Sequence, residues 1–179
     1  MRPLFKYTTI IFLSITTTLD IFAQLPLKPK SSPLDMTSIK YDSTYVKITY
    51  SRPHKNGKKI FGELVPYDSL WKTGDNEATE ITTNNKILIG SDTLHAGTYS
   101  IFTIPGEQSW TIIFNKKVGL WGNYLYDEKY DVFRLVASVD KTHVIYEPFT
   151  IEFGKKIMKN TELYFIWENT KVIIPVEFL

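Results

Sequence analysis

Cysteine is absent from the sequence, and its absence removes several kinds of site. The chain forms no disulfide, has no thiolate nucleophile and binds no metal through sulfur. It also offers no cysteine that would carry a lipid at a processed N-terminus. The fold must therefore be held together by packing, and 179 residues with 43% hydrophobic side chains suffice for one core.

The sequence also has little excess charge of either sign. Charged residues make up 22% of the chain, and the formal net charge is only +2. No basic run has the pattern expected of a surface that follows a phosphate backbone. We therefore predict no nucleic-acid partner.

Recognisable catalytic and cofactor motifs are missing as well. His54, His95 and His143 are far apart in the sequence and show no ligand spacing such as His-x-His. There is no Gly-x-Ser-x-Gly nucleophile turn and no phosphate loop ending in Gly-Lys-Ser or Gly-Lys-Thr. We predict no metal and no cofactor, although separate histidines could still meet in space.

No segment of helical length shows the spacing of an amphipathic helix, and alternating segments take its place. In 45–50, YVKITY, the apolar side chains Val46 and Ile48 alternate with Lys47 and Thr49 as in a half-buried strand. Roughly nine short strands, with turns about every eight to twelve residues, predict an all-β fold. We expect an antiparallel β-sandwich with jelly-roll-like connections.

Tight turns are predicted between several neighbouring strands. Asn84 and Asn85 separate two short strands, and an Asn-Asn pair tolerates the positive φ of a hairpin. Residues 168–171 would close another hairpin between the last two strands. Segments 131–139 and 143–153 likewise indicate two separate strands.

The N-terminal segment has the features of a secretory signal. Residues 1–23 combine a short positive start, an apolar stretch and a small residue, Ala23, at the expected cleavage point. Retention as a membrane anchor is the alternative, but the apolar run is shorter than a span of about 20 residues and Asp20 interrupts it. We predict export to the periplasm or beyond, with no membrane span after cleavage. Residues 24–36 then form an extended lead-in, and 37–179 form one domain.

A candidate ligand site lies around residues 71–81, WKTGDNEATEI. Charged, amide and aromatic side chains gather here and just after the 45–50 strand: Arg52, His54, Trp71, Lys72, Asn76 and Glu77. An aromatic face stacks on a sugar or planar ligand while polar groups orient it. We therefore predict a non-catalytic binding domain for a glycan or a small polar or carboxylate-bearing metabolite.

Other interpretations of the same residues stay open. Gly74, Asp75 and Asn76 make a good turn by composition alone, and Arg52 could simply pair with Glu77. Glu77 could instead be the acid or base of a glycosidase-like hydrolase, with a second carboxylate from Asp127, Asp131 or Glu147. A structural interaction module of the cell envelope is a third possibility, and it would show a large exposed apolar patch. Trp121, Tyr124 and Tyr126 could form a glycan platform or seal the end of the sandwich.

Three motifs in order resemble a known family. Residues 50–81, YSRPHKNGKKIFGELVPYDSLWKTGDNEATEI, are similar to the signature of the exported bacterial family known as domain of unknown function 2911. Residues 94–115 resemble its Ala-Gly-x-Tyr and Trp-Thr segment, and 121–135 resemble its Trp-Gly loop followed by Asp-Val-x-Arg. The resemblance spans roughly residues 33–178. It implies an all-β exported domain of Gram-negative bacteria and no established reaction.

This chain departs from the family pattern at several positions. Lys58-Lys59 stands where Gly-Arg is usual, Asp68 replaces a Gly, Lys72 an Arg and Asp75 an Ala. A change from Arg to Lys keeps the charge but loses the flat fork that grips a carboxylate with two hydrogen bonds. If a carboxylate binds here, we expect a looser grip than the family pattern would provide.

Overall fold

The computed structural model describes residues 30–179 as an all-β domain, so the predicted signal segment 1–23 lies outside the described residues. Apart from one 3-10 turn, Glu128–Tyr130, the described elements are strands, as predicted. They are β1 Leu34–Tyr41, β2 Thr44–Ser51, β3 Thr79–Thr83, β4 Ile87–Ile89, β5 Asp92–Leu94, β6 Gly97–Pro105, β7 Ser109–Asn115, β8 Asp131–Phe153 and β9 Asn160–Phe178. Within residues 30–179, no helix is long and apolar enough to cross a membrane.

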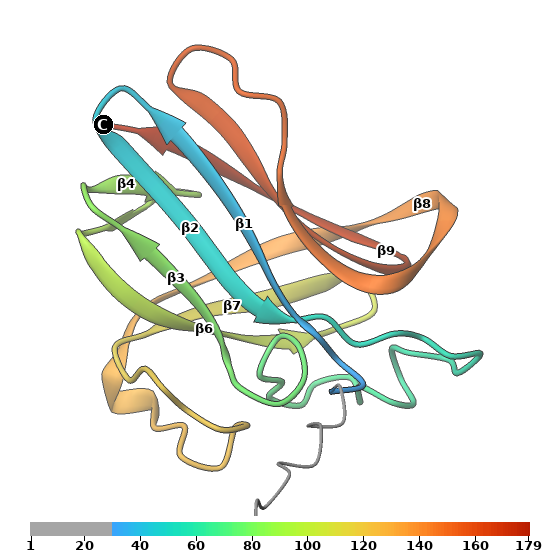
Figure 1. The fold of residues 1–179 in the computed structure, drawn as a ribbon. Coiled ribbons are helices and arrows are strands. Elements are labelled where there is room, and N and C mark those ends of the chain that lie inside the picture. The colour runs from blue at the N-terminus through green and yellow to red at the C-terminus, as the bar shows by residue number, and fades with distance from the viewer. Residues whose placement is uncertain (1–29) are drawn as a thin grey trace, which may run out of the picture.

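The nine strands form one antiparallel sheet in the order β1-β2-β3-β6-β7-β8-β9-β4-β5. Strand β8 pairs with β7 through Asp131–Ser138 and with β9 from Val139 onward, so it belongs to both halves of the sheet. Figure 1 shows the long, curved β8 and β9 crossing behind β1, β2 and β3. The sheet therefore curls over on itself, which is compatible with the expected two-layer arrangement, while the hydrogen-bonded ladder stays continuous.

The core fills the space between the two halves of the curled sheet. Alternate residues of β2, among them Val46 and Ile48, are fully buried, because one face of this strand points inward. Residues of β9 such as Phe165, Ile174 and Phe178 face them from the other half. Burial of this apolar surface is the main favourable contribution to folding, as expected for a chain without disulfides.

The number of strands agrees with the sequence prediction, but two of the predicted turns are wrong. Residues 131–153 form one strand, β8, whose pairing with β9 is interrupted by register shifts. Residues 160–178 also form one strand, β9, and Glu168 is accommodated inside it with a φ of 56°. In both strands the predicted turn is an irregularity of the β8–β9 pairing, like a β-bulge. Each chain stays extended on both sides of it, because the other long strand continues to pair with it.

Two further strands, β1 and β5, were not predicted. They bring the number of strands back to nine after two predicted pairs merged into β8 and β9. Strand β1 begins at Leu34, inside the stretch expected to be an extended lead-in, and its outward side chains Leu34, Met36, Ser38 and Lys40 mix apolar and polar types. Strand β5 has only three residues and pairs with β4 across Gly90, whose φ is 63°. Both strands lie at edges of the sheet, where a strand pairs with only one neighbour. The alternation of apolar and polar residues is weak in such strands.

The hairpin predicted at Asn84 and Asn85 is also wrong. Strand β3 pairs with β2 and β6, whereas β4 pairs with β5 and β9, so the chain passes from one half of the sheet to the other here. Neither asparagine has a positive φ. Asn84 accepts from the Tyr45 backbone N–H at 2.7 Å and donates to the Ser43 carbonyl at 2.8 Å. These side chains anchor the crossing to the β1–β2 turn, which is a tertiary role.

Candidate functional site

The segment 71–78 is tied down at both ends, to strand β6 at one end and to the loop after β7 at the other. Trp71 exchanges two backbone hydrogen bonds with Thr103 of β6, at 2.7 and 2.9 Å. The chain then turns sharply, and Thr73 and Asn76 both have positive φ, at 59° and 56°. At the far end, the Ala78 N–H donates to the Leu120 carbonyl at 2.9 Å. The segment is therefore a fixed turn, and it holds its side chains in a defined direction.

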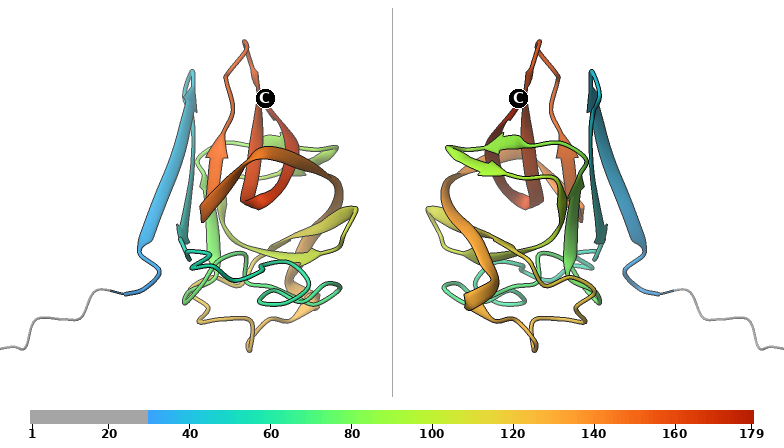
Figure 2. Two further views of the ribbon diagram at one scale, coloured as in Figure 1. Left: turned by 90° about the vertical axis from the view of Figure 1, so that its right-hand side faces the viewer. Right: turned by 90° about the vertical axis from the view of Figure 1, so that its left-hand side faces the viewer.

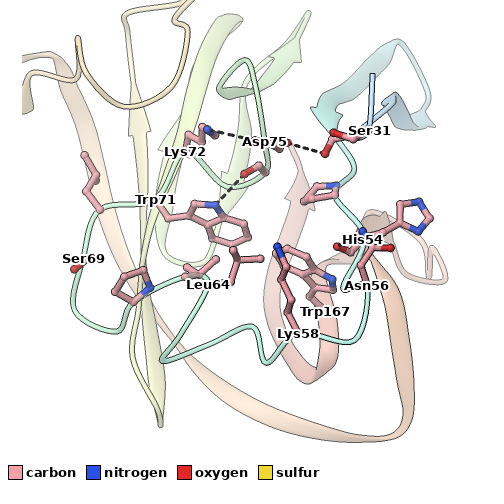
Figure 3. A pocket seen from close by; sticks show the side chains of 16 residues that line it. Ser31, His54, Asn56, Lys58, Leu64, Ser69, Trp71, Lys72, Asp75 and Trp167 are labelled. Atoms are coloured by element: carbon pink, nitrogen blue, oxygen red, sulfur yellow. Dashed lines mark hydrogen bonds and ion pairs between the residues drawn. The ribbon is translucent and has the colours of Figure 1, made fainter. Parts of the chain in front are cut away.

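A pocket of about 370 Å³ opens beside this turn (Figure 3). Its walls come from four stretches of chain: the N-terminal Ser31 and Ser32, the 53–58 segment, the 64–75 segment and Trp167 of β9. Three of the predicted site residues line it, namely His54, Trp71 and Lys72. Leu64, Val65, Pro66 and Leu70 form an apolar side of the same pocket. A pocket of this size is in the range of small-molecule sites.

Trp71 links the pocket to the core. Its indole ring packs nearly parallel to Trp167, with centroids 6.0 Å apart, and edge-on against Phe149 at 5.0 Å. Phe61 and Trp110 complete this aromatic cluster. The Trp71 indole N–H donates to the Gly74 carbonyl at 2.9 Å, so the ring also holds the turn that follows it. Trp71 therefore packs against the core and also forms part of the pocket wall.

Basic groups dominate the polar side of the pocket. Lys58 and His54 are exposed on its wall, and the ion pairs within residues 30–179 include none for Lys58. Lys72 lies 3.5 Å from Asp75, whose other carboxylate oxygen accepts from the Ser32 hydroxyl at 2.7 Å. Lys72 is thus partly neutralised, while Lys58 is available to a ligand.

Asp75 is held in its ionised form by these neighbours. Burial by itself would raise the pKa of this carboxyl, but hydrogen bonds from the Ser32 hydroxyl and the Asn76 backbone N–H, together with Lys72, outweigh it and lower the pKa. A depressed pKa in the folded state means that the carboxylate stabilises the fold above the unfolded pKa of Asp. This contribution is lost as the pH falls through the folded pKa.

We therefore expect the effect of Asp75→Asn on stability to depend on pH. At neutral pH the variant should unfold more easily than the native protein, by less than about 1 kcal/mol because the Lys72 pair is partly exposed to water. At an acidic pH below the folded pKa of Asp75, which lies under the ordinary value of Asp, the difference should vanish, since the native carboxyl is then protonated as well. Urea unfolding at both pH values measures it, and an equal difference at both would contradict the assignment.

Arg52 does not reach the pocket, contrary to expectation. Its guanidinium lies 3.2 Å from Asp35 of β1 and donates to the Phe149 carbonyl and the Thr150 hydroxyl of β8, at 3.2 and 3.0 Å. Its side chain thus ties β1 and β2 to β8. The predicted pairing of Arg52 with Glu77 is also absent from the described contacts, because β1, which was not foreseen, supplies the carboxylate instead.

Asn76 and Glu77 do not line this pocket either. The Asn76 amide donates to the Ser32 carbonyl at 3.3 Å, which fastens the N-terminal segment to the turn. Glu77 lies 2.8 Å from Lys30 and lines a separate depression of about 360 Å³ with Glu80. The hydrogen bond from Lys30 lowers the pKa of Glu77, so this carboxyl is ionised at neutral pH. The six predicted residues therefore do not form one site.

The carboxylates suggested as catalytic partners of Glu77 are engaged elsewhere. Asp131 accepts from Asn115, Tyr126 and Arg134, with distances of 2.7–2.8 Å. Asp127 pairs with Lys129 at 2.9 Å, and Glu147 accepts from the Asn56 backbone N–H at 2.7 Å. Glu80, which does share the depression with Glu77, accepts from the Gly119 N–H at 2.6 Å. Each of these acids has a structural partner.

Comparison with models of known protein families assigns the chain to one family. The model of a family described as a protein of unknown function, DUF2911, matches residues 32–176, which is most of the sequence. The chain belongs to the DUF2911 family. No curated protein and no solved structure matches it.

The DUF2911 match includes the whole pocket wall except Ser31. It also includes the motif at 121–135, whose Tyr126, Asp131 and Arg134 hydrogen-bond to one another. Burial and the Asp131 carboxylate raise the pKa of Tyr126 to about 12, so its hydroxyl stays protonated and donates to Asp131. This network fastens the long loop after β7 to the start of β8. Tyr124 and Trp121 of the loop are 83% and 56% exposed, so they do not seal the sheet, and they lie outside the pocket wall.

Several pocket residues of this DUF2911 protein were missed by the sequence reasoning. Ser32, Asn56, Lys58, Leu64 and Trp167 line the pocket, and Trp167 lies in β9, far along the chain. Lys58 was not among the residues predicted to bind a ligand. Its position two residues after Asn56 in an exposed turn carries no periodic signal, so the sequence could not show which way it points. Among residues 30–179, no three His, Asp or Glu side chains gather as a metal site would require.

Proposed function

We propose that this DUF2911 protein is an exported, non-catalytic binding domain for a small glycan or polar metabolite that carries a carboxylate. The supporting observation is a pocket whose wall combines Lys58, which has no ion-pair partner among residues 30–179, and the partly paired Lys72 with the apolar side chains around Trp71. A ligand with both an apolar face and a negative group matches this wall. Export rests on the sequence of the N-terminal segment, which supports it independently of the pocket.

The size and the two-sided character of the pocket support a small ligand. A volume of about 370 Å³ is sufficient for a molecule of the size of a sugar acid or a dicarboxylate. The partly buried Trp71 and the neighbouring Leu70 and Leu64 offer a surface on which a sugar ring or short carbon chain can rest. Lys58, His54 and Asn56 provide hydrogen-bond donors on the other side.

Binding is favoured over hydrolysis by the state of the acidic groups. Glycosidases use two carboxyl groups, and one of them must be protonated to donate to the leaving group. Glu77 lies in a different depression from this pocket, and its lowered pKa opposes the role of a general acid. In the pocket itself, the carboxylate of Asp75 is occupied by Lys72 and Ser32. The contacts of Glu77 and Asp75 therefore do not support the alternative of a glycosidase-like hydrolase.

Replacing Lys58 with glutamine is the sharpest test of the pocket. In a screen by thermal shift and calorimetry against glucuronate, galacturonate, succinate and neutral glucose, we expect acidic ligands to stabilise the protein and glucose to do so less. The Lys58→Gln variant should bind the best acid about tenfold more weakly, because one charge-assisted hydrogen bond is lost.

The neighbouring Lys59 provides a matched control. It pairs with Glu63 at 3.6 Å, is well exposed and does not line the pocket, so Lys59→Gln should leave the affinity unchanged. A screen without any binder, or equal losses in the two variants, would overturn the proposed function. Tighter binding of glucose than of the acids would show that the pocket takes a neutral glycan instead.

A further inference from the structure

The turn between β8 and β9 exposes apolar side chains at its tip. Ile157 and Met158 are 65% and 80% exposed, and they are adjacent in the chain. Ile157 and Asn160 exchange two backbone hydrogen bonds, at 2.8 and 3.0 Å, so the tip is a closed two-residue turn. Its apolar side chains are therefore presented in a fixed direction and do not fold back on the sheet.

Met158 occupies a backbone conformation that disfavours its side chain. Its φ is +54°, a region where glycine and asparagine are usual in two-residue turns and other residues are strained. The position thus combines backbone strain with exposure of an apolar side chain, and both are unfavourable in water. Strain of this kind is concentrated at functional positions.

Basic side chains surround the tip. Lys155, Lys156 and Lys159 flank the two apolar residues, and Lys156 donates to the backbone carbonyl of Lys40 in β1 at 2.8 Å. Lys159 pairs with Glu177 of β9 at 2.5 Å, which leaves Lys155 and Lys156 without a carboxylate partner among the described ion pairs. Asp42 lies in the neighbouring β1–β2 turn. The net charge of these residues around Ile157 and Met158 is still positive.

We propose that this tip, residues 155–159, docks the protein on an anionic lipid bilayer, with Ile157 and Met158 in the apolar boundary and the lysines at the headgroups. Apolar side chains at a basic tip match the two layers that such a surface presents, namely acyl chains below and negative headgroups above. Only two side chains enter, so the contact is interfacial and reversible and is not a membrane span.

The position of the tip fits such a contact. Figure 2 shows the β8–β9 turn at one end of the molecule and the loops of residues 52–70 at the opposite end. A protein docked by this turn would hold the loops of residues 52–70 at the end far from the bilayer. The residues of the docking surface and of the pocket are separate. The membrane proposal can therefore be wrong while the ligand-binding proposal is right, and the reverse.

Vesicle cosedimentation tests the proposal with the chain in the form in which it is purified, its N-terminus defined by mass spectrometry. We expect binding to phosphatidylcholine vesicles containing phosphatidylglycerol, weaker binding to pure phosphatidylcholine, and a decline with added salt. Met158→Gly should weaken binding at least about tenfold by removing one inserted side chain. Lys155→Gln should weaken it about fivefold, and only on the anionic vesicles.

The controls separate the tip from the rest of the surface. Glycine adopts positive φ without strain, so Met158→Gly should keep or raise the unfolding midpoint, and loss of binding cannot then be attributed to misfolding. Val136→Thr changes an apolar residue that is 71% exposed on β8, and Lys116→Gln removes a lysine from the loop after β7; neither should alter binding. All variants share the same N-terminus, so its contribution cancels. Absence of binding to anionic vesicles, or binding that Met158→Gly leaves intact, overturns the proposal and indicates a protein partner for the tip.

Discussion

Replacing Trp71 with alanine is expected to lower the free energy of unfolding by about 3 kcal/mol or more. The side chain packs against Trp167, Phe149 and two further aromatic rings, and its removal leaves a cavity between β6 and β9. The hydrogen bond from the indole to the Gly74 carbonyl is lost as well, so the turn that carries Lys72 loosens. Urea unfolding followed by far-UV circular dichroism measures the change.

Trp121→Ala is the matched control for this prediction. Trp121 is 56% exposed, and besides its backbone bridge to Glu77 its ring contacts only the ammonium of Lys30 among the described aromatic interactions, at 5.5 Å. Its replacement should cost less than about 1 kcal/mol. Similar losses in the two variants would show that the cluster around Trp71 does not stabilise the fold. Trp71→Phe should keep part of the packing and separate ligand binding from stability.

Replacing Gly74 with alanine should also destabilise the protein, by about 2 kcal/mol or more. A Cβ atom here would lie 2.8 Å from the backbone carbonyl oxygen of Ser51, which cannot move without disturbing the end of β2. Gly74 also has a φ of +155° and lines the pocket. The variant must shift the 71–77 turn, so we expect ligand affinity to fall together with the unfolding midpoint.

Gly57→Ala separates backbone strain from the steric clash. Gly57 has a φ of +75°, but an added Cβ would meet no atom within 4 Å. This variant should therefore show only the cost of the left-handed conformation, about 1 kcal/mol. If Gly74→Ala costs no more than Gly57→Ala, the close approach of the turn to β2 is not what requires glycine at residue 74.

The candidate site shows where sequence reasoning succeeded and where it stopped. The 71–77 motif is indeed a rigid turn beside a pocket, because its glycine, asparagine and tryptophan have local conformational preferences. The grouping of its side chains was wrong for Arg52, Asn76 and Glu77. Arg52 forms an ion pair with Asp35 of β1, and Glu77 forms one with Lys30 on another part of the surface. A residue two positions further along a turn can face the opposite way, and spacing alone does not reveal it.

The strand pattern shows the same division. Alternation correctly placed β2, since the period of two is a local property of each strand. Whether two adjacent segments pair with each other depends on the rest of the sheet. Residues 160–178 therefore continue as one strand where a hairpin was expected, and Asn84 begins a crossing between the two halves.

By itself, the sequence determined that this protein is an all-β domain without cysteine chemistry, because composition and alternation are local and additive properties. It also determined the family and the part of the chain where a pocket forms. The tertiary structure alone decided which side chains share that pocket, because Ser32, Lys58, Trp71 and Trp167 come from four separate stretches. The tertiary structure alone also placed the apolar tip of the β8–β9 turn at the end opposite the loops of residues 52–70. Such convergence depends on how the curled sheet pairs its distant strands, and no short window of sequence contains that information.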